Sequence, residues 1–258
     1  MSFRRISVIS AIFVLVLYGG LIGSLFYFFR SSLFLEALFS KRILFSIRLS
    51  LYTAALASFL SVALGIPVAY ALSRFDFPGK RIVDTLLELP LVVSPAAFGA
   101  MLLIFFNTPV GNWIQERGIR FAFEVRGIVL AQVVTTVGIA TRLIKTVLDE
   151  IPQRYEDVAR SLGASPVRAF ATITLPLSKR GIVASWGLTW ARALGEFGAT
   201  ITLAGSMAMK TETLTIAIFM RLSTADIEAT VVLIFILVAV GLGILYGVRF
   251  LSRESTYA

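Results

Sequence analysis

Two oppositely charged residues inside an apolar run are the strongest candidates for chemistry in this sequence. Arg192 and Glu196 lie four positions apart, so one turn of a helix would bring their side chains together as an ion pair. The chain contains no His and no Cys, which excludes His-based acid–base catalysis, thiolate chemistry, disulfides and the common zinc sites. Glu196 and scattered hydroxyls do not supply the acid–base pair or activated nucleophile that an intramembrane enzyme needs, which disfavours that class.

This pair belongs to a set of polar residues at helical spacing. The members of the set are Ser185, Thr189, Arg192, Glu196 and Thr200. Polar faces of membrane helices usually point into the helix bundle or toward a water-filled path. The set therefore indicates either an internal ion pair that fixes the helix or the lining of a path for an anion. We favour the ion pair, because Glu196 would cancel most of the attraction of Arg192 for a doubly charged anion.

Long apolar runs must position these residues. The chain is 57% hydrophobic, whereas roughly 45–50% is usual in soluble domains, and its mean hydropathy is +0.87. Since about 20 apolar residues cross a bilayer as a helix, we predict an all-α integral membrane protein with a single transmembrane domain over residues 1–258. Six spans are predicted, at about 6–29, 49–73, 89–107, 126–146, 181–204 and 229–248. Three prolines in or near these spans indicate either kinks or span ends: Pro67, Pro90 and Pro95.

The net charge of +9 lies mostly at the ends of the apolar runs. This placement is typical of membrane topology rather than of a nucleic-acid partner. Six spans put both termini on one side, and Lys and Arg are more numerous in the segments that share that side. We therefore predict a multi-pass protein of the cell membrane, surrounded by the lipid bilayer, with both termini in the cytoplasm.

A charged segment between the fourth and fifth predicted spans has the pattern of two short helices joined by an elbow. Its first part is apolar on one helical face, at Ile151, Tyr155, Val158, Ala159 and Leu162. Pro152 suits the first turn of this helix and Gly163 the left-handed position just past its end. The second helix would be capped by Ser165, with Pro166 at its first position.

The first of these helices is too short to cross a membrane. At about eleven residues it would be about 16 Å long. Its apolar face predicts either a helix that rests on the membrane surface or one that docks into a soluble partner. Periodicity alone leaves both alternatives open.

The spacing of this segment resembles the cytoplasmic "EAA" loop of ATP-binding-cassette (ABC) importer permeases. That family pattern reads E-A-A, three residues, G, nine residues, I-x-L-P. Here "DVA" (157–159) precedes Gly163 at the family spacing and "ITLP" (173–176) follows it. Asp157 stands in the glutamate place and Val158 in the first alanine place, while the adjacent Glu156 could share the acidic role.

Other stretches resemble the molybdate and tungstate permeases, which are related to sulfate permeases. The second and third spans do so through "GIPVAYALSRFDFPGKR" (65–81) and "LPLVVSPAAFGAMLLIFF" (89–106), and the fifth through "WARALGEFGATITLAG" (190–205). The stretch "MKTETLTIAIFMRLSTADIEA" (209–229) is most similar to the archaeal-type members. The resemblance covers most of the chain after about residue 49.

This resemblance implies the type I importer fold, with six transmembrane helices and a cytoplasmic coupling helix in a loop at about 149–178. The chain would be a non-catalytic half-channel without a cofactor or metal, moved by two copies of an ABC ATPase subunit. An extracytoplasmic oxyanion-binding protein would deliver molybdate or tungstate, with sulfate or another oxyanion as the alternative. The residues implied in ATPase coupling are Glu156, Asp157, Val158, Ala159, Leu162, Gly163, Ala164, Ser165 and Pro166.

Two absences from the sequence agree with this division of labour. A phosphate-binding loop needs G-x-x-x-x-G-K-[ST], but Gly79-Lys80 is followed by Arg81, and Arg74 stands where the first glycine should be. We also find one coupling loop and no internal repeat, which disfavours an ion-driven secondary transporter. Since two motor subunits need two such loops, the chain is expected to pair with a second copy of itself.

Overall fold

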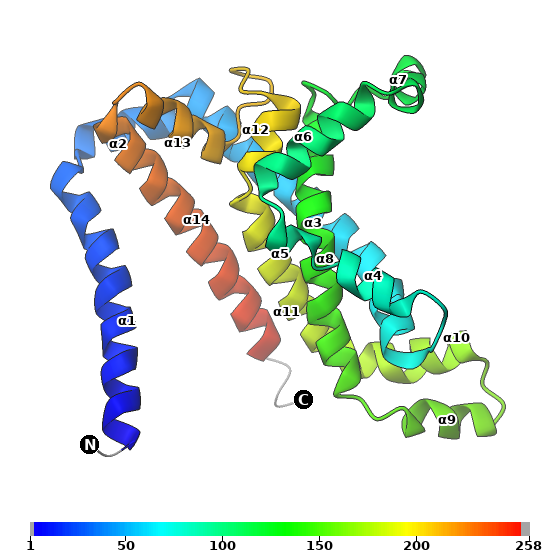
Figure 1. The fold of residues 1–258 in the computed structure, drawn as a ribbon. Coiled ribbons are helices and arrows are strands. Elements are labelled where there is room, and N and C mark those ends of the chain that lie inside the picture. Colours follow the sequence, from blue (N-terminus) through cyan, green and yellow to red (C-terminus); the bar gives the residue numbers. More distant parts are fainter. Residues whose placement is uncertain (1–2, 254–258) are drawn as a thin grey trace.

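The computed structural model describes residues 3–253, and every regular element in that part of the chain is a helix (Figure 1). Residues 1–2 and 254–258, which include both predicted cytoplasmic ends, lie outside the described part. The elements are α1 (Phe3–Leu25), η1 (Phe26–Phe28), α2 (Ser31–Phe39), α3 (Lys41–Arg74), α4 (Lys80–Leu86), α5 (Leu89–Val92), α6 (Pro95–Phe106), α7 (Pro109–Glu116), α8 (Val125–Asp149), α9 (Arg154–Ser161), α10 (Pro166–Ala169), η2 (Phe170–Thr174), α11 (Leu175–Leu194), α12 (Gly198–Ala204), α13 (Leu214–Ser223) and α14 (Ile227–Arg253).

Four helices of the described part are long and apolar enough to cross a bilayer as straight rods. They are α1 with its short extension η1, α3, α8 and α14. The helix α11 is 20 residues long but falls outside this group, because it carries Lys179, Arg180 and Arg192. Its length still matches the roughly 20 residues that a span requires.

The third predicted span, 89–107, is not one straight helix. The segment Lys80–Val92 and the helix Pro95–Phe106 meet at an angle of 114°. Val93 and Ser94 between them are extended, and the Ser94 hydroxyl caps α6 by accepting a hydrogen bond from the Ala97 amide at 3.3 Å. Proline at position 95 disfavours a helical residue before it, so the chain turns sharply here and restarts as α6.

The fifth predicted span, 181–204, is also divided. The helix α11 ends at Leu194 and α12 begins at Gly198, so Gly195, Glu196 and Phe197 are not helical. The predicted polar set therefore does not follow the face of a single helix. Its first three members lie on α11, Glu196 lies in the break, and Thr200 lies on α12.

The core of the bundle is the face of α3 that packs against α8 and α11. Val62 and Ala69 of α3 pack there with Ala140 and Ile144 of α8. This face of α3 also buries hydroxyl side chains, and one of them, Ser61, shares a 2.9 Å hydrogen bond with Thr136 of α8. Small side chains, whose hydroxyls form hydrogen bonds within the bundle, let membrane helices approach closely.

The helix α1 runs apart from this bundle (Figure 1), and none of its residues is buried. The chain rejoins the bundle through aromatic contacts of Phe26 and Phe29 with Phe235 of α14, at centroid distances of 4.9 and 5.2 Å. Figure 1 shows that α1 begins and α14 ends at the end of the molecule that carries α9, whereas α2, α7 and α13 lie at the opposite end.

Candidate functional site

The helix α9 is shorter than predicted, and it ends as predicted. It spans eight residues, Arg154–Ser161, and Pro152 lies before it rather than in its first turn. At its end Gly163 adopts φ +93°, while the amides of Gly163 and Ala164 donate to the carbonyls of Arg160 and Ala159, both at 3.0 Å. This pair of bonds is the Schellman motif, which closes a helix at a left-handed glycine.

The second helix of the segment starts as the sequence predicts. The Ser165 hydroxyl accepts a hydrogen bond from the Arg168 amide at 3.3 Å, and Pro166 is the first residue of α10. The chain then continues without a break through the π-helix η2 into α11. The elbow at Gly163 is therefore joined through α10 and η2 to α11 without an intervening loop.

The apolar face of α9 is uncovered. Tyr155, Val158 and Leu162 are 45%, 59% and 84% exposed. Together with Ala159 of α9 and Ile173 and Leu177 of the following helices, they border an open hollow of about 460 Å³. A short helix with such a face is suited to a partner or to the membrane surface, as the sequence predicted.

Glu156, one of the residues implied in coupling, lies on the other side of α9. Its side chain is almost fully buried, so it does not form part of the exposed face, and its carboxylate points toward the bundle. It accepts hydrogen bonds from the Tyr70 hydroxyl at 2.6 Å, from the Thr174 hydroxyl at 2.6 Å and from the Arg74 guanidinium at 3.0 Å. We call these four residues the Glu156 cluster. The exposed acid is Asp157, whose carboxylate lies 3.9 Å from Arg160.

The Glu156 cluster keeps its carboxylate ionised. Burial alone would raise the pKa of Glu156, but hydrogen bonds from Thr174, Tyr70 and Arg74 and the charge of Arg74 outweigh burial and hold this pKa below its ordinary value. The charge of Arg74 is shared further, because its guanidinium also donates to the carbonyls of Leu148 at 3.1 Å and Ile151 at 2.8 Å. The cluster thus contains an ion pair between Glu156 and Arg74, and both carboxylate oxygens accept hydrogen bonds.

Arg192 and Glu196 form the ion pair that their spacing predicts, across the end of α11. The distance from Arg192 Nη1 to Glu196 Oε2 is 2.8 Å. The other carboxylate oxygen, Oε1, accepts a hydrogen bond from the Ala199 amide at 3.1 Å, so Glu196 also caps the first turn of α12. The Glu196 side chain is 1% exposed and that of Arg192 is 37% exposed.

The other members of the predicted polar set do not join this pair through their hydroxyls. Ser185 and Thr189 are buried, and they donate to the carbonyls of Gly181 and Ser185 within α11, at 2.8 and 2.7 Å. Thr200 is buried on α12, and within residues 3–253 its hydroxyl has no hydrogen-bond partner. The geometry thus separates one ion pair from three hydroxyls.

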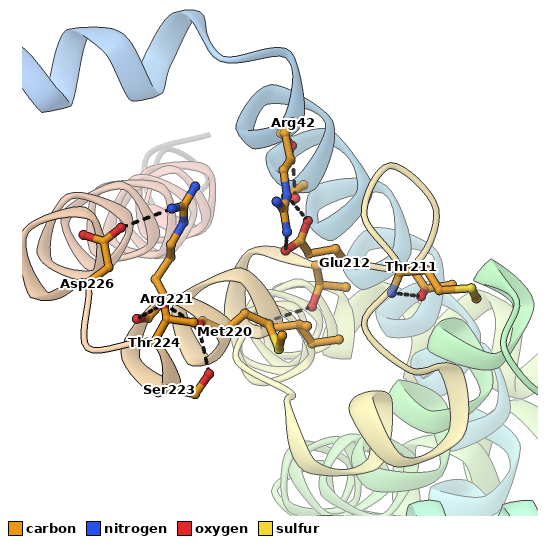
Figure 2. Close-up of polar contacts among 12 residues, drawn as sticks. Arg42, Thr211, Glu212, Met220, Arg221, Ser223, Thr224 and Asp226 are labelled. Atoms are coloured by element: carbon orange, nitrogen blue, oxygen red, sulfur yellow. Dashed lines mark hydrogen bonds and ion pairs between the residues drawn. The ribbon is translucent and has the colours of Figure 1, made fainter.

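The opposite end of the molecule holds an ion pair that sequence reasoning missed (Figure 2). Arg42, at the start of α3, donates two hydrogen bonds to the Glu212 carboxylate, at 2.7 and 2.6 Å, and Glu212 is buried. Figure 2 also shows the contact between Arg221 and Asp226 at the turn between α13 and α14. Arg221 Nη1 donates to Asp226 Oδ2 at 3.1 Å. Arg42 and Glu212 are 170 positions apart, so no local spacing signals their contact.

The chain matches one protein family over most of its length. The family model described as "Binding-protein-dependent transport system inner membrane component" matches residues 61–255. The molybdenum transport system permease protein ModB of Escherichia coli is 39% identical over 190 residues, which are 71% of this chain and 82% of that protein. The sulfate transport system permease protein CysT of Escherichia coli is 31% identical over 221 residues, 85% and 80% of the two chains.

A probable molybdenum ABC transporter permease protein of Haloferax volcanii is 36% identical over 194 residues, 75% of this chain and 70% of that protein. Among solved structures, a bacterial alginate ABC transporter in complex with an alginate pentasaccharide-bound periplasmic protein has a TM-score of 0.79. That match covers 99% of this chain and 95% of that one at 17% identity. The inward-facing MetNI methionine ABC transporter has a TM-score of 0.61 at 18% identity and covers 84% and 99%. At these identities the solved structures establish the fold.

Proposed function

The chain belongs to the binding-protein-dependent transport system inner membrane component family, and on that premise we propose that it conducts a tetrahedral oxyanion, molybdate or tungstate, in ATP-driven import. It is a multi-pass membrane subunit of an ABC importer and is itself non-catalytic, because members of this family leave ATP hydrolysis to a partner subunit. The oxyanion class is the part of this statement that needs support from individual relatives.

The proposed class of anion rests on the transport systems named for the relatives. The molybdenum permeases are 39% and 36% identical and the sulfate permease 31% identical, and molybdate and sulfate are both tetrahedral dianions. These identities do not separate the two anions, so sulfate import is the alternative. The similarity of residues 209–229 to archaeal-type molybdate and tungstate permeases favours molybdate or tungstate.

The helix α9 is proposed as the coupling helix that contacts the ATPase subunit. Its exposed apolar face would enter a groove on that subunit, and Gly163 would let the elbow fold tightly enough to enter this groove. The elbow continues directly into α10 and α11, so a movement of α9 has a short route into the membrane. The membrane surface is the alternative site for this face.

Six spans are proposed by pairing the broken segments. They are α1, α3, α6 with the elbow α4–α5, α8, α11 with α12, and α14. The helices α1 and α14 then begin and end at the α9 end (Figure 1), which we propose faces the cytoplasm. Two copies of the chain would stand side by side over two ATPase subunits, with an extracytoplasmic binding protein at the α7 end.

Arg192 and Glu196 are proposed to hold the break between α11 and α12 in place. The carboxylate is buried, paired and capping α12, so its charge is satisfied within the chain. A role in the anion path is the alternative, which the partial exposure of Arg192 keeps open.

Reconstitution tests the proposed function. The chain is placed in proteoliposomes with its ATPase subunit and the oxyanion-binding protein, and uptake of molybdate, tungstate and sulfate is measured separately. We expect molybdate and tungstate uptake that requires both the ATPase subunit and ATP. Uptake driven by an ion gradient without ATP would indicate a secondary transporter, and preferential sulfate uptake would select the alternative anion.

A further inference from the structure

The attachment of α9 to the rest of the protein is polar. Of its eight residues, Glu156 is buried, Ala159 is partly buried, and the other six are exposed. A surface helix ordinarily attaches through an apolar stripe, but the apolar stripe of α9 faces outward. The orientation of α9 therefore depends on the Glu156 cluster.

Three elements of the chain meet at this one carboxylate. Tyr70 and Arg74 come from the last turns of α3, Glu156 from α9 and Thr174 from the end of η2. Arg74 adds the end of α8 and the linker before α9, because it donates to the Leu148 and Ile151 carbonyls. Charge-assisted hydrogen bonds are short and directional, so they fix an angle as well as a distance.

The π-helix η2 brings Thr174 to this position. A π-helical turn holds one residue more than an α-helical turn, which rotates the residues after it around the helix axis. Thr174 is the last residue of η2 and is fully buried. Phe170, the first residue of η2, packs edge-on against the Tyr70 ring at 4.8 Å between centroids. The turn thus presents an aromatic ring to Tyr70 of α3 and a hydroxyl to Glu156 of α9.

We propose that Glu156 is the positioning residue that holds α9 at a fixed angle to α3 and α11, so that displacement of α9 is transmitted to these membrane helices. This inference rests on the proposed function of α9 as the coupling helix. Loss of the charge removes the ion pair with Arg74 and weakens two hydrogen bonds, while the exposed face of α9 stays intact. The ATPase subunit still binds, and its work no longer reaches the membrane helices.

The experiment compares Glu156→Gln with two milder changes and a control. Tyr70→Phe and Thr174→Val each remove one hydroxyl donor and keep the ion pair. Glu150→Gln changes an exposed glutamate at the end of α8. A nitroxide on Arg160→Cys reports the mobility of α9, because the native chain has no cysteine. Each protein is reconstituted with the ATPase subunit and binding protein, and molybdate uptake per ATP hydrolysed is measured.

For Glu156→Gln we expect a mobile nitroxide spectrum, retained ATPase binding and a roughly tenfold or greater loss of uptake per ATP. The two milder variants should lie between it and the wild type, and Glu150→Gln should match the wild type. Unchanged uptake per ATP in Glu156→Gln overturns the proposal, and so does a loss of uptake with an ordered spectrum. If Glu156→Gln does not insert, the milder variants decide by the same criteria.

Failure of the proposed function has a different signature. Wild-type protein that shows no ATP-dependent uptake, or does not bind the ATPase subunit, contradicts the importer assignment. The nitroxide spectra still test whether the Glu156 cluster orients α9, because they require only the chain in a membrane.

Discussion

Gly163 offers a sharp test of the docking role of α9, because the protein itself leaves room for a side chain there. Its φ is +93°, and a Cβ built on it would meet nothing within 4 Å. A substitution therefore costs only the left-handed backbone strain, about 1–2 kcal/mol. Since 1.4 kcal/mol corresponds to a factor of ten, this strain can weaken binding of the ATPase subunit by about five- to thirtyfold.

Two substitutions separate strain from obstruction. Gly163→Ala and Gly163→Glu carry the same strain, but glutamate also places a large charged side chain beside the exposed Leu162. We expect both proteins to reach normal levels in the membrane, because the spans are held by the bilayer and by each other. Gly163→Glu should bind the ATPase subunit at least about tenfold more weakly than Gly163→Ala and lose ATP-driven uptake.

The assay is titration of the ATPase subunit onto the chain in nanodiscs. Gly118→Glu is the matched control, because Gly118 has φ +88° and an equally open Cβ position, and it closely follows α7, which lies at the opposite end of the molecule (Figure 1). Equal affinities for the two Gly163 variants, or full ATPase-dependent uptake by Gly163→Glu, would refute the docking argument. In that case α9 lies on the membrane surface.

Three further predictions concern packing, charge and topology. Arg192→Ala strands the buried Glu196 carboxylate, so protein yield should fall, and neutralising both residues should recover part of it. The loss of folding stability should stay below the roughly 3–5 kcal/mol that breaking a fully buried ion pair costs. Normal yield with lost uptake would instead favour a role of the pair in the anion path. Gly99→Ala places a Cβ 2.7 Å from the Ala199 carbonyl oxygen, so it should destabilise the protein by about 1–3 kcal/mol and lower its Tm. Gly241→Ala, whose Cβ would meet nothing within 4 Å, should leave the Tm unchanged. A cysteine at Ala164 should react with an impermeant thiol reagent only from the cytoplasmic side, and labelling from outside would reverse the proposed orientation.

Features that depend on a few neighbouring residues were predictable from the sequence. The left-handed Gly163, the Ser165 cap and Pro166 at the first position of α10 follow from local backbone rules, and the structure confirms all three. The pairing of Arg192 with Glu196 follows from helical spacing in the same way. The long helices α3, α8 and α14 overlap the continuous apolar runs at 49–73, 126–146 and 229–248, although α3 begins earlier, at Lys41.

Features that depend on distant residues were not predictable. At the break after Leu194 the Ala193 carbonyl accepts a local hydrogen bond from the Glu196 amide and a second one from the distant Gln132 side chain of α8, both at 3.1 Å. The inward direction of Glu156 depends on Tyr70 and Arg74, which lie more than 80 positions earlier. Each of these partners lies far in the sequence from the residue that it contacts, so local patterns do not indicate the contact.

The isolation of α1 bears on how the protein enters the membrane during synthesis. Because α1 buries no residue against its own chain, it can pass from the insertion machinery into lipid as soon as it emerges. The helix α3 differs from α1, because it buries polar hydroxyls such as that of Ser61, which forms a hydrogen bond with Thr136 of α8. We expect α3 to stay with the machinery until α8 has been made, and crosslinking of chains stalled at successive lengths would show release of the two helices at different times.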